Sequence, residues 1–239
     1  MHPLTALTNL LYPPACLLCH APLPAADRPL CGACEQACPR NGPPVCTACG
    51  MELPGAFDAL LRCRVCRNIP PAYEMARAPW RYAGGTAQAV RQFKYHRRWR
   101  IGRWLVEAMA AAAHTSLPLD EIDAVVPVPL HWLKRRLRGA DPVQQLAGGL
   151  ARSLEKPCLP LALRRRRWTA TQTRLRGRAR RRNVRGAFAA RPRLVRGRSL
   201  LLVDDVLTSG ATAQACAQAL RAAGARRVFV LTAARTSRV

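Results

Sequence analysis

The chain has 239 residues and a mass of 26.3 kDa, enough for one domain of ordinary size and one small module. Its 39 Lys and Arg against 13 Asp and Glu give a net charge of +26, which disfavours an enzyme that meets only small neutral substrates and favours polyanions or phosphorylated ligands as partners. No apolar run approaches the roughly 18 residues of a membrane-spanning helix, so we expect no integral membrane segment.

The charge is unevenly placed along the chain. Residues 1–77 carry six basic and five acidic side chains, whereas residues 78–239 carry 33 and eight. This shift predicts two domains, 1–77 and 78–239. The N-terminus lacks the positive start and the unbroken apolar run of a secretory signal, so we expect a cytoplasmic protein. The short amphipathic segment 4–11 leaves peripheral contact with the inner membrane open, although packing onto its own domain is favoured.

Eight of the 11 cysteines form four Cys-x-x-Cys pairs. The pairs are Cys16/Cys19, Cys31/Cys34, Cys46/Cys49 and Cys63/Cys66. Two thiolates at this spacing can bind one tetrahedral cation, so four pairs predict two structural zinc ions. Disulfides are disfavoured in a cytoplasmic chain, and a redox pair would need a thioredoxin-like context that is missing here. Adjacency assigns the first four cysteines to one ion and the last four to the other, but the sequence leaves crossed pairing open. Cys38, Cys158 and Cys216 fall outside the pattern and are interpreted as small buried side chains.

From residue 78 the pattern alternates between strands and helices. We expect a short strand before a Gly84-Gly85 turn, then helix with apolar positions at Val90, Phe93, Ile101, Leu105 and Met109. Further on, the pattern predicts a strand at 123–130, a helix at 141–154 with Asp141 as N-cap and Pro142 at its first position, a strand at 199–207, a helix at 212–225 stopped by Gly224, and a strand at 226–234. Such alternation predicts an α/β fold with a parallel sheet.

Two adjacent carboxylates, Asp204 and Asp205, stand at the end of the strand at 199–207. Ligands of parallel α/β sheets bind beyond the carboxyl ends of strands. Gly210 permits close backbone approach, the following helix start offers free N–H groups, and Thr208, Ser209 and Thr212 add hydroxyls, which together predict a phosphate-binding loop. The carboxylates are suited to accept hydrogen bonds from a sugar diol and to help hold hydrated Mg²⁺. The competing interpretation is that they merely cap the next helix.

The stretch "LLVDDVLTSGAT" resembles the phosphoribosyl-pyrophosphate-binding motif of type I phosphoribosyltransferases. Together with the four cysteine pairs, "FKYHRRWRIGRWL", "VVPVPLHWLKRRLRG" and "TATQTRLRGRARRRNVRGAF", in this order, the chain is similar over essentially its whole length to ComF-type competence proteins. This resemblance implies an N-terminal double zinc ribbon, a phosphoribosyltransferase-like domain and a link to DNA uptake in natural transformation, with proteins of the uptake machinery as further partners.

The resemblance also implies site residues. Asp204 and Asp205 correspond to the pair that binds the ribose diol, and Thr208, Ser209, Gly210, Ala211 and Thr212 to the 5′-phosphate loop. Val128 falls in the pyrophosphate-loop region, 126–130. Where the family commonly has Arg-Gly-Phe-Asn-Gln, this chain has Arg138-Gly139-Ala140-Asp141-Pro142, which removes the Phe and the Asn.

Phosphoribosyl transfer would depend on neutralising the departing pyrophosphate with Mg²⁺ and nearby cations. The cationic candidates are Lys94, Lys134, Arg135, Arg136 and Arg138, of which Lys94 and Arg138 rank highest because each lies inside a family-like motif. A solvated surface charge is the alternative for each. No residue stands out as general base, since neither His96 nor His131 shows an orienting partner.

Residues 164–198 contain 15 Arg and no acidic residue, and the resemblance places them in a long loop over the active site. Such density of guanidinium groups favours a nucleic-acid backbone as ligand, and exposed tryptophans could stack on single-stranded bases. The five Trp residues are Trp80, Trp99, Trp104, Trp132 and Trp168, with core packing as the alternative for each. Two functions remain open: a competence factor that binds single-stranded DNA and phosphoribosyl pyrophosphate, or an active phosphoribosyltransferase of nucleotide metabolism with an unknown acceptor.

Overall fold

The computed structural model describes residues 13–53, 55, 61–96, 98–130, 141–167, 184 and 186–237. The strands are β1 (Ala76–Arg77), β2 (Trp80–Arg81), β3 (Ala124–Pro127), β4 (Leu163–Arg165), β5 (Phe188–Ala190), β6 (Ser199–Leu207) and β7 (Arg227–Arg235). The helices are α2 (Gly32–Gln36), α3 (Arg64–Asn68), α4 (Gly84–His96), α5 (Trp99–Ser116), the 3₁₀ turn η1 (Leu119–Glu121), α7 (Pro142–Ser153), α9 (Pro192–Val195) and α10 (Ala211–Ala222). None of the described helices is long and apolar enough to span a membrane.

The main sheet is parallel, which confirms the predicted α/β fold. Its strand order is β1-β7-β6-β3, and β2 pairs with the end of β7. β6 coincides with the predicted strand, while β3 and β7 lie within a few residues of theirs. In the central pairing Leu202 faces Val230 on one side and Val126 on the other. All the strands therefore end at one edge of the sheet, where the chain places Asp204 and Asp205.

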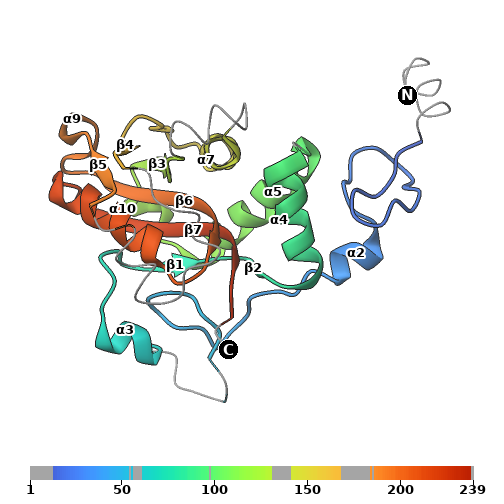
Figure 1. Ribbon diagram of the computed structural model, residues 1–239, viewed down its shortest axis with the longest axis horizontal. Helices are drawn as coiled ribbons and strands as arrows, with labels where there is room; N and C mark the ends of the chain where they lie inside the picture. The colour runs from blue at the N-terminus through green and yellow to red at the C-terminus, as the bar shows by residue number, and fades with distance from the viewer. Residues whose placement is uncertain are drawn as a thin grey trace.

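The sheet is covered on both faces. Because alternate strand residues point to opposite sides, Leu201 and Val203 pack with α4, α5 and α7, whereas Leu200 and Leu202 pack with α10. In Figure 1, α4 and α5 stand together beside the sheet, and α10 lies on the side of β5 and α9. β4 and β5 form a separate antiparallel pair that contacts α10.

The sequence predicts one helical segment after a turn at Gly84-Gly85, but the structure has two helices there, α4 and α5. Gly84 and Gly85 form the first residues of α4 and not a turn before it. α4 ends at His96, and Arg98 has a non-helical backbone (φ −78°, ψ 79°) before α5 begins. The two helices meet where Gly102 faces Phe93: a Cβ at Gly102 would lie 2.7 Å from the Phe93 ring. Gly102 thus permits a close approach that periodicity along the sequence cannot predict.

The predicted ends of two helices are confirmed. The Asp141 carboxylate accepts hydrogen bonds from the backbone N–H groups of Val143 (3.1 Å) and Gln144 (3.2 Å) and caps α7. At the other helix, Gly224 adopts φ +95°, and the N–H of Ala225 donates to the carbonyl of Leu220 at 3.0 Å after α10 ends. This is the left-handed glycine stop expected from the sequence.

The cysteine-rich N-terminal chain packs at two different places on the α/β domain. Residues 16–38 share a hydrophobic core with α4 and α5, whereas the Ala76 N–H in β1 donates to the Ala48 carbonyl at 2.8 Å. The two parts lie apart in Figure 1, where α2 is beside α4 and α3 lies on the side of β1. Because β1 belongs to the main sheet, the domain boundary that we propose after residue 77 falls between β1 and β2.

Candidate metal centres and ligand site

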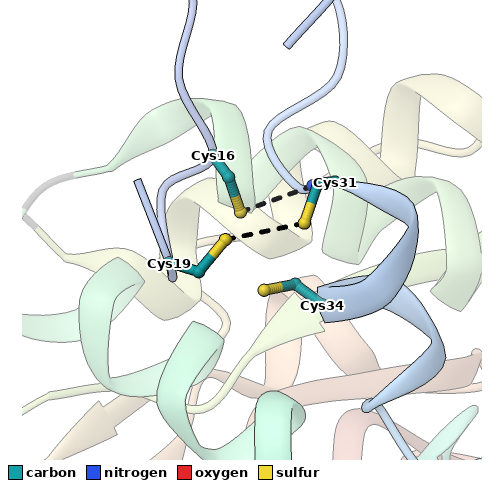
Figure 2. A group of neighbouring side chains, drawn as sticks. All are labelled: Cys16, Cys19, Cys31 and Cys34. Carbon is teal, nitrogen blue, oxygen red and sulfur yellow. Dashed lines mark hydrogen bonds between the residues drawn. The ribbon is translucent and has the colours of Figure 1, made fainter. Parts of the chain in front are cut away.

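The first cysteine cluster consists of Cys16, Cys19, Cys31 and Cys34. Their sulfur atoms all lie within 4.8 Å of one another, and the Cys19 and Cys31 sulfurs are 3.6 Å apart. The four side chains converge on one point in front of α2 (Figure 2). Tetrahedral zinc with Zn–S bonds of about 2.3 Å requires sulfur separations of about 3.8 Å, so the cluster fits one ion.

The second cysteine cluster consists of Cys46, Cys49, Cys63 and Cys66, and all four side chains are buried. The Cys49 and Cys63 sulfurs are 3.8 Å apart. Backbone N–H groups of Cys49 and Cys63 donate to the Cys46 sulfur at 3.5 and 3.3 Å, and hydrogen bonding, above all from the Cys49 side chain, lowers the pKa of Cys46. These contacts stabilise the Cys46 thiolate, whereas hydrogen bonding with Cys46 raises the pKa values of Cys49 and Cys66.

The two clusters follow the order of the sequence, so pairing is by adjacency and not crossed. Each is a four-thiolate set with no position left for a substrate, which is typical of structural zinc. The clusters are therefore consistent with two zinc ions. Cys38, Cys158 and Cys216 lie outside both clusters. Cys38 and Cys216 are buried as predicted, whereas Cys158 is only half-buried.

The acidic pair stands at the carboxyl end of β6 with its side chains on opposite faces. Asp205 points toward α4, where its Oδ2 lies 2.7 Å from Lys94 Nζ. Burial opposes the charge on Lys94, but attraction to Asp205 outweighs it and raises the pKa of Lys94. Lys94 therefore stays protonated and joins α4 to the acidic pair.

Asp204 lies on the α10 face, and its Oδ1 accepts a hydrogen bond from the Asp205 N–H at 2.9 Å. Burial, reinforced by the charge of Asp205, raises the pKa of Asp204 to about 8. A carboxyl group with this pKa exchanges a proton near neutral pH. The pair thus combines a charged member, Asp205 with its lysine, and a member that titrates near neutrality.

The loop after β6 has the backbone expected of an anion-binding turn. Gly210 adopts φ +76°, a conformation that side chains disfavour, and α10 begins at Ala211. The Ala211 N–H faces the Ser209 hydroxyl at 3.4 Å. Thr208 lies in the loop and Thr212 in the first turn of α10, so the predicted phosphate-loop residues surround one helix N-terminus.

The neighbouring strand brings a second loop to the same edge. β3 ends at Pro127, and the Val128 N–H donates to the Val203 carbonyl at 2.9 Å, one residue before Asp204. The predicted pyrophosphate-loop region thus starts beside the acidic pair. Lys134, Arg135, Arg136 and Arg138 lie outside the described residues, as do His131, Trp132, Trp168 and the segment 4–11.

The tryptophans divide between core and surface. Trp80 and Trp104 are buried and stack with ring centroids 4.3 Å apart, so they belong to the core. Trp99 is 44% exposed and meets Phe93 edge to face. Of the described tryptophans, only Trp99 is exposed enough to meet a base. His96 is exposed at the end of α4.

Two residues near the loop were not anticipated from the sequence. Arg235, at the end of β7, donates to the carbonyls of Leu207 (3.0 Å) and Thr208 (2.8 Å). Tyr73 is buried with its hydroxyl over Gly210, 3.5 Å from where a Cβ would stand. One signal for Arg235 exists in the sequence: it directly follows an apolar strand next to β6, and adjacent parallel strands end at the same edge.

Comparison with known proteins identifies the relatives of this chain. Residues 7–70 match the family model of the double zinc ribbon domain. The DNA utilization protein YhgH of Escherichia coli (strain K12) is 34% identical over 181 residues, which cover 74% of this chain and 78% of that protein. The chain belongs to the YhgH and competence protein F family. Competence protein F of Haemophilus influenzae is 28% identical to this member of the family, over 72% of this chain and 78% of that protein.

The resemblance to ComF-type competence proteins is thereby confirmed. Among solved structures, this chain is similar to the glutamine phosphoribosylpyrophosphate amidotransferase from B. subtilis complexed with ADP and GMP. The identity is 28%, the match covers 54% of this chain and 25% of that chain, and the TM-score is 0.37.

Proposed function

We propose that this member of the YhgH and competence protein F family acts in DNA utilisation by binding phosphoribosyl pyrophosphate with Mg²⁺ at the end of β6 and single-stranded DNA on an arginine-rich surface. The names of two relatives, DNA utilization protein and competence protein F, support a role in DNA utilisation. The observation that supports phosphoribosyl pyrophosphate as the ligand is the acidic pair. Its Asp205 is bonded to Lys94, and the pair lies beside a loop with a left-handed glycine and a helix N-terminus.

Each part of this site suits one part of the ligand. Asp204 and Asp205 would accept hydrogen bonds from the ribose diol, and the loop of Thr208, Ser209, Gly210, Ala211 and Thr212 would bind the 5′-phosphate. The loop that starts at Val128, with Arg138 further along, would bind the pyrophosphate. Lys94 would hold Asp205 in place and add positive charge. Mg²⁺, bound with the ligand, would be shared by pyrophosphate and carboxylate oxygens.

An arginine-rich surface supports the DNA ligand. Arg164, Arg166 and Arg167 are exposed on or next to β4, and Arg193, Arg196 and Arg198 are exposed after β5. The β4–β5 pair packs against α10, on the face of the sheet that carries Asp204. Positive charge on this scale favours a phosphate backbone. Arg164, Arg166 and Arg167 lie on or beside the strand whose Arg165 interacts with Asp204, so DNA bound to them would lie near the phosphoribosyl pyrophosphate. Arg193, Arg196 and Arg198 precede β6 at the opposite edge of the sheet.

Calorimetric titration of the zinc-loaded protein with phosphoribosyl pyrophosphate and Mg²⁺ tests the site. We expect binding to wild type and a loss of about 100-fold or more in affinity for Asp204→Asn combined with Asp205→Asn, because two hydrogen-bond acceptors of the diol are lost. The matched control is Asp120→Asn with Glu121→Gln, an adjacent acidic pair in η1 at the opposite end of β3. The control should bind like wild type. Wild-type affinity in the Asp204 and Asp205 variant would refute the site.

A second candidate function is phosphoribosyl transfer itself, and the titration of Asp204 favours it. The ionised form of a carboxyl group with a pKa of about 8 is a stronger base than an ordinary carboxylate and can take up a proton from an acceptor. Release of pyrophosphate by wild type would establish turnover, and its loss in Asp204→Asn at saturating ligand would assign the base. Binding without release would leave the DNA-handling function alone.

A further inference from the structure

Arg235 is a buried cation, and none of the described residues offers it a carboxylate partner. Its exposed fraction is 3%, and no other Arg or Lys of the described chain is buried as deeply. None of the ion pairs between described residues includes it. A buried guanidinium is expensive to desolvate unless negative charge or several acceptors surround it. Among the described residues, the acceptors that face Arg235 are two carbonyl oxygens and one sulfur, and none is a carboxylate.

The guanidinium joins two sites that lie far apart in the sequence. Nη1 donates to the carbonyls of Leu207 and Thr208 at 3.0 and 2.8 Å, where the phosphate loop begins. Nη2 donates to the Cys49 sulfur of the second cysteine cluster at 3.3 Å. One rigid, planar group thus bonds a metal-binding sulfur and the backbone of the ligand loop at once.

Zinc loading supplies the missing charge. Four thiolates and one Zn²⁺ carry a net charge of about −2, so the filled second cluster is a strong acceptor beside Arg235. In the filled cluster the metal also fixes the Cys49 side chain, so the hydrogen bond from Nη2 anchors the guanidinium whose Nη1 bonds the two loop carbonyls. Loss of the metal would free the Cys49 side chain and remove this anchor, which favours movement of the guanidinium away from the loop carbonyls.

Two further features lie between the second cluster and the loop region: a contact from the chain after α3 to α10, and a cavity. The Ala72 N–H donates to Gln214 Oε1 of α10 at 2.8 Å. Between the cluster and the loop lies a cavity of about 50 Å³, lined by Cys49, Cys66, Tyr73, Gly210 and Arg235. A space of this size can hold a few water molecules.

We propose that Arg235 is a positioning residue through which zinc in the second cysteine cluster holds the phosphate loop in its ligand-binding conformation. The first cluster, which packs beside α4 and α5, makes no such contact among the described residues. The purpose assigned to the loop rests on the proposed function, but the coupling between cluster and loop does not. The metal state of one cluster would thus regulate ligand binding, while the other would serve only stability.

Hydrogen–deuterium exchange of the loop amides at 207–212 tests the coupling without any ligand. We expect exchange to accelerate about tenfold in Arg235→Met, the change that corresponds to one lost hydrogen bond to a charged group. Arg235→Lys keeps the charge but cannot reach all three acceptors, so a smaller acceleration is expected. This second variant also covers the case in which Arg235→Met fails to fold.

Two matched controls separate coupling from general loosening. Arg77 also lies near the second cluster, but its Nη1 donates to the carbonyls of Thr47 and Ala76 and not to the loop. Arg77→Met should leave loop exchange unchanged. Cys66→Ser in the second cluster should accelerate it, whereas Cys34→Ser in the first should not.

A spectroscopic measurement checks the contact with the metal. With Co²⁺ in place of zinc, the sulfur-to-metal absorption of the second cluster should shift in Arg235→Lys, because the hydrogen bond to Cys49 changes. Unchanged loop exchange in Arg235→Met, or equal acceleration in Cys34→Ser and Cys66→Ser, would overturn the proposal. The two proposals can fail separately. If loop exchange is faster in Arg235→Met but wild type does not bind phosphoribosyl pyrophosphate, the coupling is supported and the proposed ligand is refuted.

Discussion

Asp204 differs from an ordinary surface carboxylate in what surrounds it. It is held between the end of β6 and α10, and burial is the main cause that raises its pKa to about 8. Negative neighbours add to the effect and Lys94 opposes it. The ionisable groups that act on it from the surrounding elements are Asp205, Lys94, Asp141, Arg165 and Cys216.

This raised pKa predicts a pH dependence of stability. The native state holds the Asp204 proton more tightly than the unfolded chain, whose pKa is near 3.8, so the stabilisation is complete below about pH 4 and is lost as the pH rises to about 8. Between pH 5 and 8 we expect the free energy of unfolding of wild type to fall relative to Asp204→Asn, by at most about 1.4 kcal/mol per pH unit. Urea denaturation of both zinc-loaded proteins measures this. Parallel pH profiles would contradict it.

Residues that belong to one continuous motif could be predicted from the sequence. Asp204, Asp205 and Gly210 stand where a strand meets a helix, and the structure places them at one sheet edge. Lys94 was ranked from its motif, but its ion pair with Asp205 depends on how α4 packs against β6. Arg235 could not be found in this way, because its three acceptors come from segments that only folding brings together.

The β4–β5 pair is the element that displays the arginine surface. If it binds DNA, replacing Arg164, Arg166 and Arg167 by Ser should weaken single-stranded DNA binding and reduce the slope of log affinity against log salt by about 2, roughly 0.7 for each lost phosphate contact. Fluorescence anisotropy of a labelled oligonucleotide between low and physiological salt measures the slope.

The control for this element removes equal charge elsewhere. Arg62, Arg64 and Arg67 are exposed on or just before α3, next to the second cysteine cluster. Their replacement by Ser should leave the slope nearly unchanged. An equal reduction in both triple variants would mean that DNA responds to net charge and not to the β4–β5 surface.

Elements with a regular pattern were predicted better than short ones. The nine-residue strands β6 and β7 and the capped helices α7 and α10 follow from apolar runs and end signals in the sequence. β1 and β2 have two residues each, too few for any periodicity, and exist because they pair with β7. The break between α4 and α5 brings Gly102 against Phe93, a packing contact that periodicity along the sequence does not reveal.

At the scale of the whole molecule, both cysteine clusters are joined to the α/β domain, the first within its hydrophobic core and the second as a small separate cluster held by hydrogen bonds. Cys16 and Leu30 lie in the same hydrophobic cluster as Leu105 of α5, and Trp104 Nε1 donates to Glu35 of α2 at 3.3 Å. At the other side, the second cluster bonds Arg235 of β7. Unfolding either cluster would therefore expose apolar surface of the α/β domain as well as its own.

This arrangement predicts that the protein loses its zinc and its fold together. Calorimetry of the zinc-loaded chain should show one transition, and chelation should lower its Tm by roughly 10 °C or more, since each kcal/mol of lost stabilisation lowers the Tm of a protein of this size by about 2–4 °C. Cys34→Ser and Cys66→Ser should each shift that same transition, because each cluster packs against the sheet or its helices. If the chain were instead an independent ribbon module joined to a self-sufficient domain, chelation would abolish a small separate transition and leave the main one in place. The shared core of Cys16, Leu30 and Leu105 favours the single transition.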